Sequence, residues 1–179
     1  MYSSSSSFPR RSKSSTCEYT TMNVLGIYKQ LQQKIPFGLG NRVFSLFFCM
    51  KAPYFRTISP LVEKLDNGVA EVSMKQSWGV QNHIKTVHAI AVCNLVEMTM
   101  GCVAESTIPN HLRWLPRGMD VKYVKKATGK LTASSHITSQ LFENPTYPHD
   151  VIIPVVVKNE GGQVVSTADV QLYISEKKQ

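Results

Sequence analysis

The chain has few of the features that assign a protein quickly to a class. Its four cysteines include no closely spaced pair, so no zinc motif, redox motif or disulfide framework is expected. No apolar run is predicted to be long enough to span a bilayer, and the apolar core of a secretory signal is missing. These absences favour a protein of a reducing compartment with no resident metal, whose core is held by packing alone. The length of 179 residues is ample for one such core.

Acidic residues are scarce at the N-terminus. The first forty residues contain Glu18 alone against five basic residues, and the segment MYSSSSSFPRRSKSS is rich in serine. This composition is typical of an organellar transit peptide and equally of a disordered tail. We therefore expect a tail or transit peptide at 1–22, helical segments at 23–52 and the main domain at 53–179. The location predicted is cytoplasmic or mitochondrial.

The formal net charge is +8, and the surplus outside the N-terminal arm concentrates between Arg113 and Lys130. Such a balance favours a polyanionic partner, while a solvated face that aids solubility explains it equally well. The candidates for binding phosphate groups are Arg113, Arg117, Lys125 and Lys126, since guanidinium and ammonium groups suit phosphate. A nucleic-acid partner is not expected, because no RNA-binding motif accompanies these residues.

Hydrophobic spacing predicts one sheet and one central helix. An amphipathic helix at 24–35 and a second apolar helix near 43–50 come first. A hairpin at 61–65 and 69–75 turns at Asn67-Gly68, because both residues tolerate positive φ. A helix over 86–104 follows, and then strands near 119–123, 131–137, 151–157 and 168–174, with Pro154 favouring an edge or a bulge. The class predicted is α+β, with an antiparallel sheet wrapped around the helix at 86–104.

The predicted central helix is apolar on nearly every side, which is typical of a buried helix. Asn94 and Glu97 are its polar exceptions and share a face with Ile90 and Gly101. A buried carboxylate is costly unless paired or neutralised. Glu97 is therefore either a structural carboxylate satisfied by hydrogen bonds, or a general base or nucleophile.

Polar residues upstream of this helix favour a chemical role. Asn82, His83, Thr86 and His88 cluster at its start. The unpaired N–H groups and the dipole of a helix N-terminus can hold a thioester oxygen as negative charge develops on it. For the two histidines taken alone, capping or ordinary packing is the better interpretation.

The segment Asn82-His-Ile-Lys-Thr-Val-His88-Ala89-Ile90, followed by Glu97, resembles the motif of hotdog-fold thioesterases related to phenylacetyl-CoA thioesterase. The family motif reads Asn-x-x-Gly-x-x-His-Gly-Gly with an acid seven residues further on. The resemblance covers roughly residues 53–174. The sequence around Pro53-Tyr54-Phe55 and His88-Ala89 is more similar to another branch of hotdog proteins, a domain family of unknown function. It implies the hotdog fold and hydrolysis of an acyl-CoA thioester.

The resemblance also implies roles for individual residues. Glu97 would activate water or attack the thioester carbonyl, the N–H of Ala89 would hold the oxyanion, and Asn82 would place the water or carbonyl. His88 would support the loop, while Ile90 and Asn94 would line the substrate site. The substrate is then acyl-CoA with no further cofactor or metal. Such sites usually form between subunits, so a homodimer or homotetramer is expected, with Glu97 facing a strand of the partner chain.

The motif departs from its family at three positions. Lys85 stands in place of a glycine, and Ala89 and Ile90 replace the Gly-Gly pair. Ala89 keeps the backbone N–H, whereas Ile90 should narrow the slot for the acyl group. These departures leave two alternatives open: a non-catalytic hotdog protein that binds acyl-CoA or lipid, and an enoyl-thioester hydratase or dehydratase on the same fold.

Overall fold

The computed structural model describes residues 23–143 and 146–177. Two helices, α1 (Val24–Lys34) and α2 (Leu39–Lys51), precede a hairpin of β1 (Leu61–Asp66) and β2 (Val69–Lys75). The long helix α3 (Ala89–Thr107) is followed by β3 (Leu112–Tyr123), β4 (Lys130–His136), β5 (His149–Asn159) and β6 (Val164–Glu176). Short 3-10 helices lie at Pro53–Ile58, Trp78–Val80 and Ser139–Phe142. The tail or transit peptide predicted at 1–22 lies outside the described residues.

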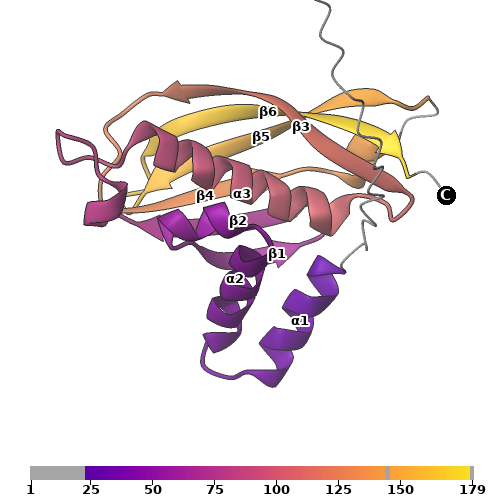
Figure 1. Cartoon of the computed structure of the whole chain (residues 1–179), viewed down its shortest axis with the longest axis horizontal. Helices are drawn as coiled ribbons and strands as arrows, with labels where there is room; N and C mark the ends of the chain where they lie inside the picture. Colours follow the sequence, from indigo (N-terminus) through magenta and orange to yellow (C-terminus); the bar gives the residue numbers. More distant parts are fainter. Residues whose placement is uncertain (1–22, 144–145, 178–179) are drawn as a thin grey trace, which may run out of the picture.

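The strands form a six-stranded antiparallel sheet in the order β1-β2-β4-β5-β6-β3. Helix α3 lies across one face of this sheet (Figure 1). It packs against β1, β2, β4, β5 and β6, and has little contact with β3. Alternate residues of β5, namely Val151, Ile153, Val155 and Val157, point into the shared core. The predicted α+β class and the single sheet around one central helix are therefore confirmed.

Helix α3 starts and ends three residues later than predicted. Val87 and His88 precede the helix because their backbone N–H groups donate to the carbonyl oxygens of Ala127 and Val80, respectively, each at 2.8 Å. Thirteen of its nineteen residues are buried, including Leu95 and Met98. By length and composition alone α3 could cross a membrane, contrary to the expectation that no apolar run is long enough. In the fold, however, 67% of this apolar stretch is buried, as expected for the core helix of a folded domain.

Helices α1 and α2 cover one edge of the sheet. The Ser45 hydroxyl accepts the backbone N–H of Val62 at 2.8 Å. The carbonyl oxygen of Glu63 accepts from the Tyr28 hydroxyl at 3.3 Å and from the Asn41 amide at 3.1 Å. These side chains satisfy backbone groups of β1 that have no further strand to pair with, so this edge is closed to additional strands.

The opposite edge of the sheet is formed by β3, which pairs only with β6. At twelve residues it is much longer than predicted, because Arg113 to Gly118 extend the strand through Pro116 with a register shift. Pro116 is compatible with this position because an edge strand has unpaired backbone groups. The Asn67-Gly68 turn is confirmed, with Gly68 at a φ of 73°.

Pro154 predicted an edge or a bulge, and β5 as a whole is not an edge strand. Strand β5 lies between β4 and β6, in the interior of the sheet. However, the pairing of β5 with β4 ends at Val156, and the Pro154 carbonyl instead accepts the Ser135 hydroxyl at 2.7 Å. Pro154 therefore sits where one ladder has already ended, so its missing N–H is not needed there. Of the cysteines in the described ranges, Cys49, Cys93 and Cys102 are free thiols.

Candidate active site

One face of α3 is left open by the sheet. Ile90, Asn94, Glu97, Gly101 and Glu105 follow each other at intervals of three or four residues, so they lie along a single stripe of the helix. Glu97 is half-buried on this stripe, which corrects the expectation of a fully buried carboxylate. The open face is the part of α3 from which side chains can reach a bound molecule.

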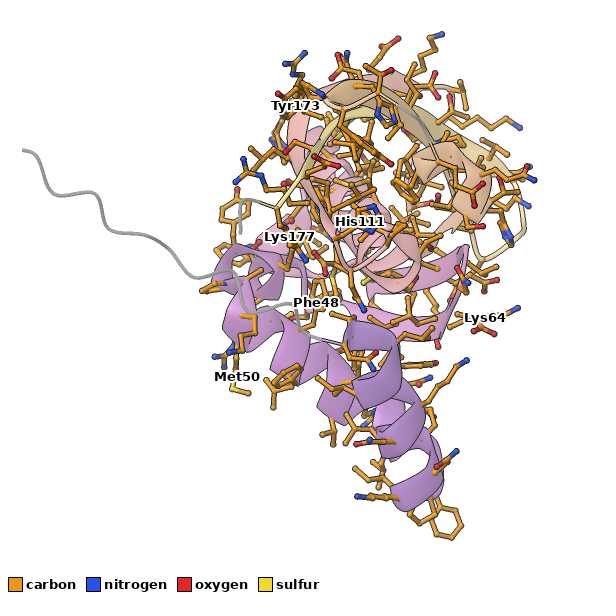
Figure 2. The ribbon with its side chains drawn as sticks, turned by 90° about the vertical axis from the view of Figure 1, so that its right-hand side faces the viewer. Phe48, Met50, Lys64, His111, Tyr173 and Lys177 are labelled. Atoms are coloured by element: carbon orange, nitrogen blue, oxygen red, sulfur yellow. The ribbon has the colours of Figure 1, made fainter. Side chains whose placement is uncertain are left out.

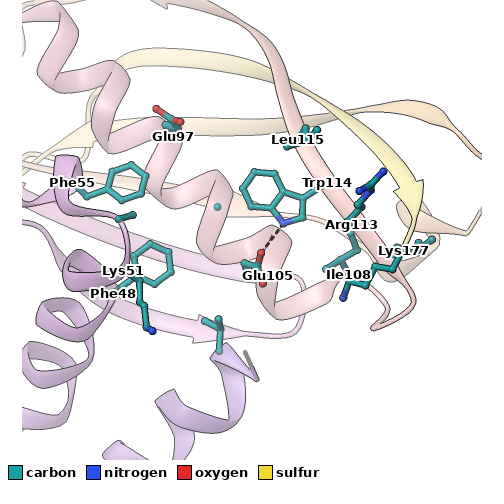
Figure 3. Close-up of a pocket in the computed structure, with 14 residues that line it drawn as sticks. Phe48, Lys51, Phe55, Glu97, Glu105, Ile108, Arg113, Trp114, Leu115 and Lys177 are labelled. Atoms are coloured by element: carbon teal, nitrogen blue, oxygen red, sulfur yellow. Dashed lines mark hydrogen bonds between the residues drawn. The ribbon is translucent and has the colours of Figure 1, made fainter. Parts of the chain in front are cut away.

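A cavity of about 540 Å³ lies beside the C-terminal half of the open face (Figure 3). Its walls are mostly apolar, with basic side chains among them. Aromatic rings come from α2, the following 3-10 helix and β3: Phe48, Phe55 and Trp114. Lys51, Arg113 and Lys177 bring positive charge to the same space. A cavity with these walls fits a molecule that is apolar along most of its length and carries negative charge.

Glu97 and Glu105 both line this cavity, two helical turns apart with Gly101 between them. No hydrogen bond or ion pair of the Glu97 side chain is found within residues 23–143 and 146–177. Figure 3 shows Glu97 on α3 and Phe55 on the preceding 3-10 helix, and both line this cavity. A half-buried carboxylate without a fixed partner has its lone pairs available for a water molecule or a substrate.

Glu105 is a site residue that the sequence analysis missed. Its carboxylate accepts the indole N–H of Trp114 at 2.9 Å (Figure 3). Burial raises its pKa above the ordinary value, while the Trp114 hydrogen bond and the charge of Lys177 lower the pKa by less. The signal was present in the sequence, since Glu105 lies eight residues after Glu97 and so continues the same helical stripe.

The other end of the open face holds the helix N-terminus. Ala89 is the first residue of α3, and His88 precedes it as the N-cap, with its Nδ1 atom accepting the N–H of Ile90 at 3.1 Å. The N–H of the first helical residue has no partner within a helix, so the Ala89 N–H is available for an oxyanion by the geometry of the helix itself. The side chain of Ile90 is 57% exposed beside it.

Asn82 holds the loop before the helix. Its Oδ1 atom accepts the backbone N–H groups of Ile84 and Thr86, at 3.1 and 3.0 Å. Its Nδ2 atom donates to the Thr86 hydroxyl at 2.8 Å. Both polar atoms are thus used within the loop, and the role of Asn82 in placing water or substrate stays a prediction. Lys85, where the motif has glycine, has a positive φ of 58°, the conformation that glycine adopts most easily.

Asn94 and Ile90 line a second, smaller cavity of about 220 Å³ together with His88 and Tyr54. The Asn94 amide nitrogen donates to the Thr57 hydroxyl at 3.0 Å, while its oxygen is buried with no partner among the described residues. The stripe on α3 is therefore divided: the carboxylates face the large cavity, and Asn94 faces the small one.

The basic residues predicted to bind phosphate do not form one surface. Arg113 lines the large cavity. Arg117 is held on the sheet by Asp150 at 2.9 Å and lies over the Tyr173 ring. Lys125 and Lys126 are exposed on the loop whose Ala127 carbonyl bonds Val87, so they lie near the start of α3.

Tyr123 at the end of β3 also contacts the start of α3. Its hydroxyl lies 3.3 Å from the Ala89 carbonyl oxygen and 2.9 Å from the Cys93 sulfur. Burial and the Cys93 contact raise the pKa of Tyr123 to about 12, so it is a neutral hydrogen-bond donor at physiological pH. Across the described ranges, no three His, Cys, Asp or Glu side chains gather as metal ligands, and we assign no metal centre.

The family model for a domain of unknown function, DUF4442, matches residues 40–174. No curated protein matches the chain at a significant level. Among solved structures, the structural-genomics protein APC5556 is 34% identical and has a TM-score of 0.72. The alignment covers 87% of this chain and all of that one.

Two structures with a functional description are more distant. A protein of unknown function from Pseudomonas aeruginosa, described as a probable thioesterase, is 17% identical with a TM-score of 0.67. The alignment covers 72% of this chain and 91% of that protein. A thioesterase from Haemophilus influenzae is 10% identical with a TM-score of 0.59, over 69% and 82% of the two chains. At these identities the likeness shows the fold, and the predicted hotdog fold is confirmed.

Proposed function

The chain belongs to the DUF4442 family of hotdog-fold domains, and we propose that within this family it hydrolyses an acyl-CoA thioester. The observation that carries the proposal is the half-buried carboxylate of Glu97, which has no partner among residues 23–143 and 146–177 and lines an apolar cavity with basic residues in its walls. The thioesterases among its structural neighbours support the same reaction class. An acyl group suits the aromatic walls, and the phosphates of coenzyme A suit the basic side chains.

In the proposed reaction Glu97 removes a proton from a water molecule, whose oxygen attacks the carbonyl carbon of the thioester. The carbonyl oxygen becomes an oxyanion and accepts the N–H of Ala89, where the dipole of α3 adds stabilisation. The tetrahedral intermediate then expels the thiolate, which takes up the proton held by Glu97, so that the carboxylate is ionised again. The products are a carboxylic acid and free coenzyme A.

The distance along α3 supports a site that is shared by two subunits. Ala89 and Glu97 are eight residues apart, which is about 12 Å along a helix axis. A single carbonyl group cannot contact both. In an antiparallel pairing of two β3 edges around a twofold axis, the two α3 helices would run side by side in opposite directions. Ala89 of one subunit would then approach Glu97 of the other.

The open edge of β3 supports this homodimer. The β1 edge is closed by Ser45, Tyr28 and Asn41, whereas twelve residues of β3 have a strand on one side only. A long unpaired edge is a template for adding another strand, and an isologous pairing closes it. The dimer is part of the proposal, and a tetramer built from two such dimers is compatible with it.

Mixing two inactive variants tests the reaction and the shared site together. Ala89→Pro removes the proposed oxyanion N–H at a helix position that proline tolerates, and His88 already has the extended backbone that must precede proline. Glu97→Gln removes the base. Each variant alone should release little thiol from a panel of short to long acyl-CoAs. Co-refolding them at equal amounts should restore about a quarter of wild-type activity, because half of the dimers are mixed and each has one intact site.

A site contained in one subunit predicts no recovery on mixing, and inactivity of the wild-type protein on the whole panel would overturn hydrolysis itself. The second candidate is an acyl-CoA-binding protein without activity, which is favoured by the exposed Ile90 side chain beside the start of α3. That candidate predicts saturable acyl-CoA binding by the wild-type protein, with no thiol released.

A further inference from the structure

Helix α2 is apolar on two opposite faces. One face is buried against the fold through Phe44 and Cys49. The other carries Leu39, Val43, Leu46 and Met50, whose side chains are between 43% and 64% exposed. The fold explains the first face only, because a helix that packs on one side normally has polar residues on the other.

The exposed residues form a continuous stripe. Their spacing of four, three and four residues places them within one narrow sector of the helix. Phe37, 96% exposed in the turn before α2, extends this stripe to the tip of the helical hairpin. Figure 2 shows Met50 pointing away from the body of the protein, whereas Phe48 points toward it. We refer to Phe37, Leu39, Val43, Leu46 and Met50 as the outer apolar stripe.

The surroundings of the outer apolar stripe carry charge of one sign. Residues 23–62 contain five basic residues and no Asp or Glu. Arg42 and Lys51 lie on opposite flanks of the stripe by their helical spacing, and both are exposed. Lys29 pairs with Asp66, the last residue of β1, at 2.9 Å. The other four form no ion pair within the described part of the chain.

We propose that the helical hairpin of α1 and α2 is a docking surface for an anionic lipid bilayer, with the outer apolar stripe inserted among the headgroups. An exposed apolar stripe flanked by Lys and Arg is the composition of helices that lie in a membrane interface. Basic residues are attracted to the negative potential of acidic lipids. Transfer of the exposed apolar side chains from water into the bilayer has a favourable free energy.

A second copy of the chain fits this surface less well. Two hairpins meeting face to face would bring their unpaired basic residues together with no acidic residue between 23 and 62 to offset them. The bilayer also explains why Phe37, the most exposed aromatic residue in the described ranges, lies at the tip. The proposal does not depend on thioester hydrolysis, although Phe48, Lys51 and Ala52 of the same region line the large cavity.

Vesicle co-sedimentation of the full chain tests the proposal. We expect binding to vesicles of phosphatidylcholine with phosphatidylserine, weaker binding to phosphatidylcholine alone, and weakening by salt. Leu46→Ser together with Val43→Ser should lower the partition coefficient about tenfold or more. Lys34→Gln with Arg42→Gln should lower it roughly fivefold per charge on the anionic vesicles.

Ile152→Ser is the matched control for Leu46→Ser. Ile152 is 57% exposed on β5 and Leu46 is 53% exposed on α2, so the two changes remove similar apolar surface from different places. Only Leu46→Ser should reduce vesicle binding. Hydrolysis of a short, water-soluble acyl thioester without vesicles should be the same in both variants, which separates membrane docking from catalysis. Equal vesicle binding by both variants and the wild-type protein would overturn the proposal.

A Trp reporter locates the contact and tests the competing occupant. Phe37→Trp should show fluorescence that is quenched by brominated lipid, beyond the background of Trp78 and Trp114 in the wild-type protein. Light scattering of Leu46→Ser provides the second readout. A smaller oligomer with unchanged vesicle binding would show that the outer apolar stripe is a contact between copies and would overturn membrane docking. Absence of any vesicle binding by the wild-type chain would do the same.

Discussion

Two carboxylates on the open face of α3 share one cavity but differ in their surroundings. Glu97 is half-buried and has no partner in the described part of the chain, whereas Glu105 is fixed by the Trp114 indole. Burial raises the pKa of Glu105, and its hydrogen bond orients one of its oxygens. A free carboxylate can move toward a water molecule or a thioester, while a bonded one is held in place.

This difference assigns separate roles to positions two helical turns apart. Glu97 is the candidate for chemistry because both of its oxygens are available. Glu105 joins the last turns of α3 to the start of β3, so its contribution is to shape the cavity wall. The cavity alone does not distinguish the two residues. The hydrogen bonding of each side chain does.

Exchanging each carboxylate for its amide has the largest expected effect. Glu97→Gln should lower kcat about 10²-fold or more with little change in Tm, because the amide keeps the size of the side chain but cannot take a proton. Glu105→Gln is the matched control and should keep most of the activity, since its amide oxygen can still accept the Trp114 N–H. Steady-state kinetics and thermal unfolding of both variants measure this. Loss of activity in Glu105→Gln alone would reverse the assignment.

Filling the space between the two carboxylates should have an intermediate effect. A Cβ atom at Gly101 would lie 3.8 Å from the Trp114 ring, which is ordinary contact, so Gly101→Ala should be tolerated. Gly101→Leu extends into the cavity and should lower kcat/KM about tenfold for long acyl chains, with a smaller loss for short ones. The measurement is the ratio of kcat/KM for a long acyl chain to kcat/KM for a short one, compared between Gly101→Leu and Gly101→Ala. An unchanged ratio would place the acyl group elsewhere.

Reversing charge at the other end of the open face should have a smaller effect. Lys125→Glu with Lys126→Glu should raise KM for acyl-CoA several-fold with little change in kcat, because phosphate contacts bind ground and transition states alike. A short acyl-pantetheine that lacks the nucleotide phosphates is the control substrate and should show the same KM in both proteins. An unchanged KM for acyl-CoA would make these lysines a solvated face.

Much of the fold follows from local patterns in the sequence. Alternation placed β2 correctly, and Asn67-Gly68 identified the first turn. The start of α3 was misplaced because the bonds from Val87 and His88 go to Ala127 and Val80, which are backbone partners that periodicity does not reveal. The second part of β3 was predicted at 119–123, whereas its first part, from Leu112 to Gly118, was missed because it lacks the alternation of a half-buried strand.

The candidate site was predictable in part. The motif singled out Glu97 and Ala89, and the structure places them eight residues apart on α3, at the cavity and at the first residue of the helix. The surroundings of Glu105 were not predictable, because Trp114 approaches it only after the chain turns back into β3. The same limit applies to Arg117, whose partner Asp150 is distant in sequence.

The pH dependence of stability provides the finest comparison of the two carboxylates. In the unfolded chain Glu105 has its ordinary pKa of about 4.5, and in the folded protein burial raises it. Between these two pKa values the folded state binds more protons than the unfolded state, so this group makes stability fall as pH rises through that window. Above the higher pKa both states are ionised, and the contribution becomes constant.

Glu105→Gln cannot titrate and removes this contribution. The free energy of unfolding of the variant relative to the wild-type protein should therefore increase as pH rises from about 4.5, and then level off. The groups with lowered pKa values, Glu63 and Asp66, produce the opposite trend, but they are present in both proteins and cancel in the difference. Urea unfolding at a series of pH values measures it. If the two curves run parallel, the Glu105 carboxyl has the same pKa folded and unfolded, and the distinction between a held and a free carboxylate would rest on the Trp114 hydrogen bond alone.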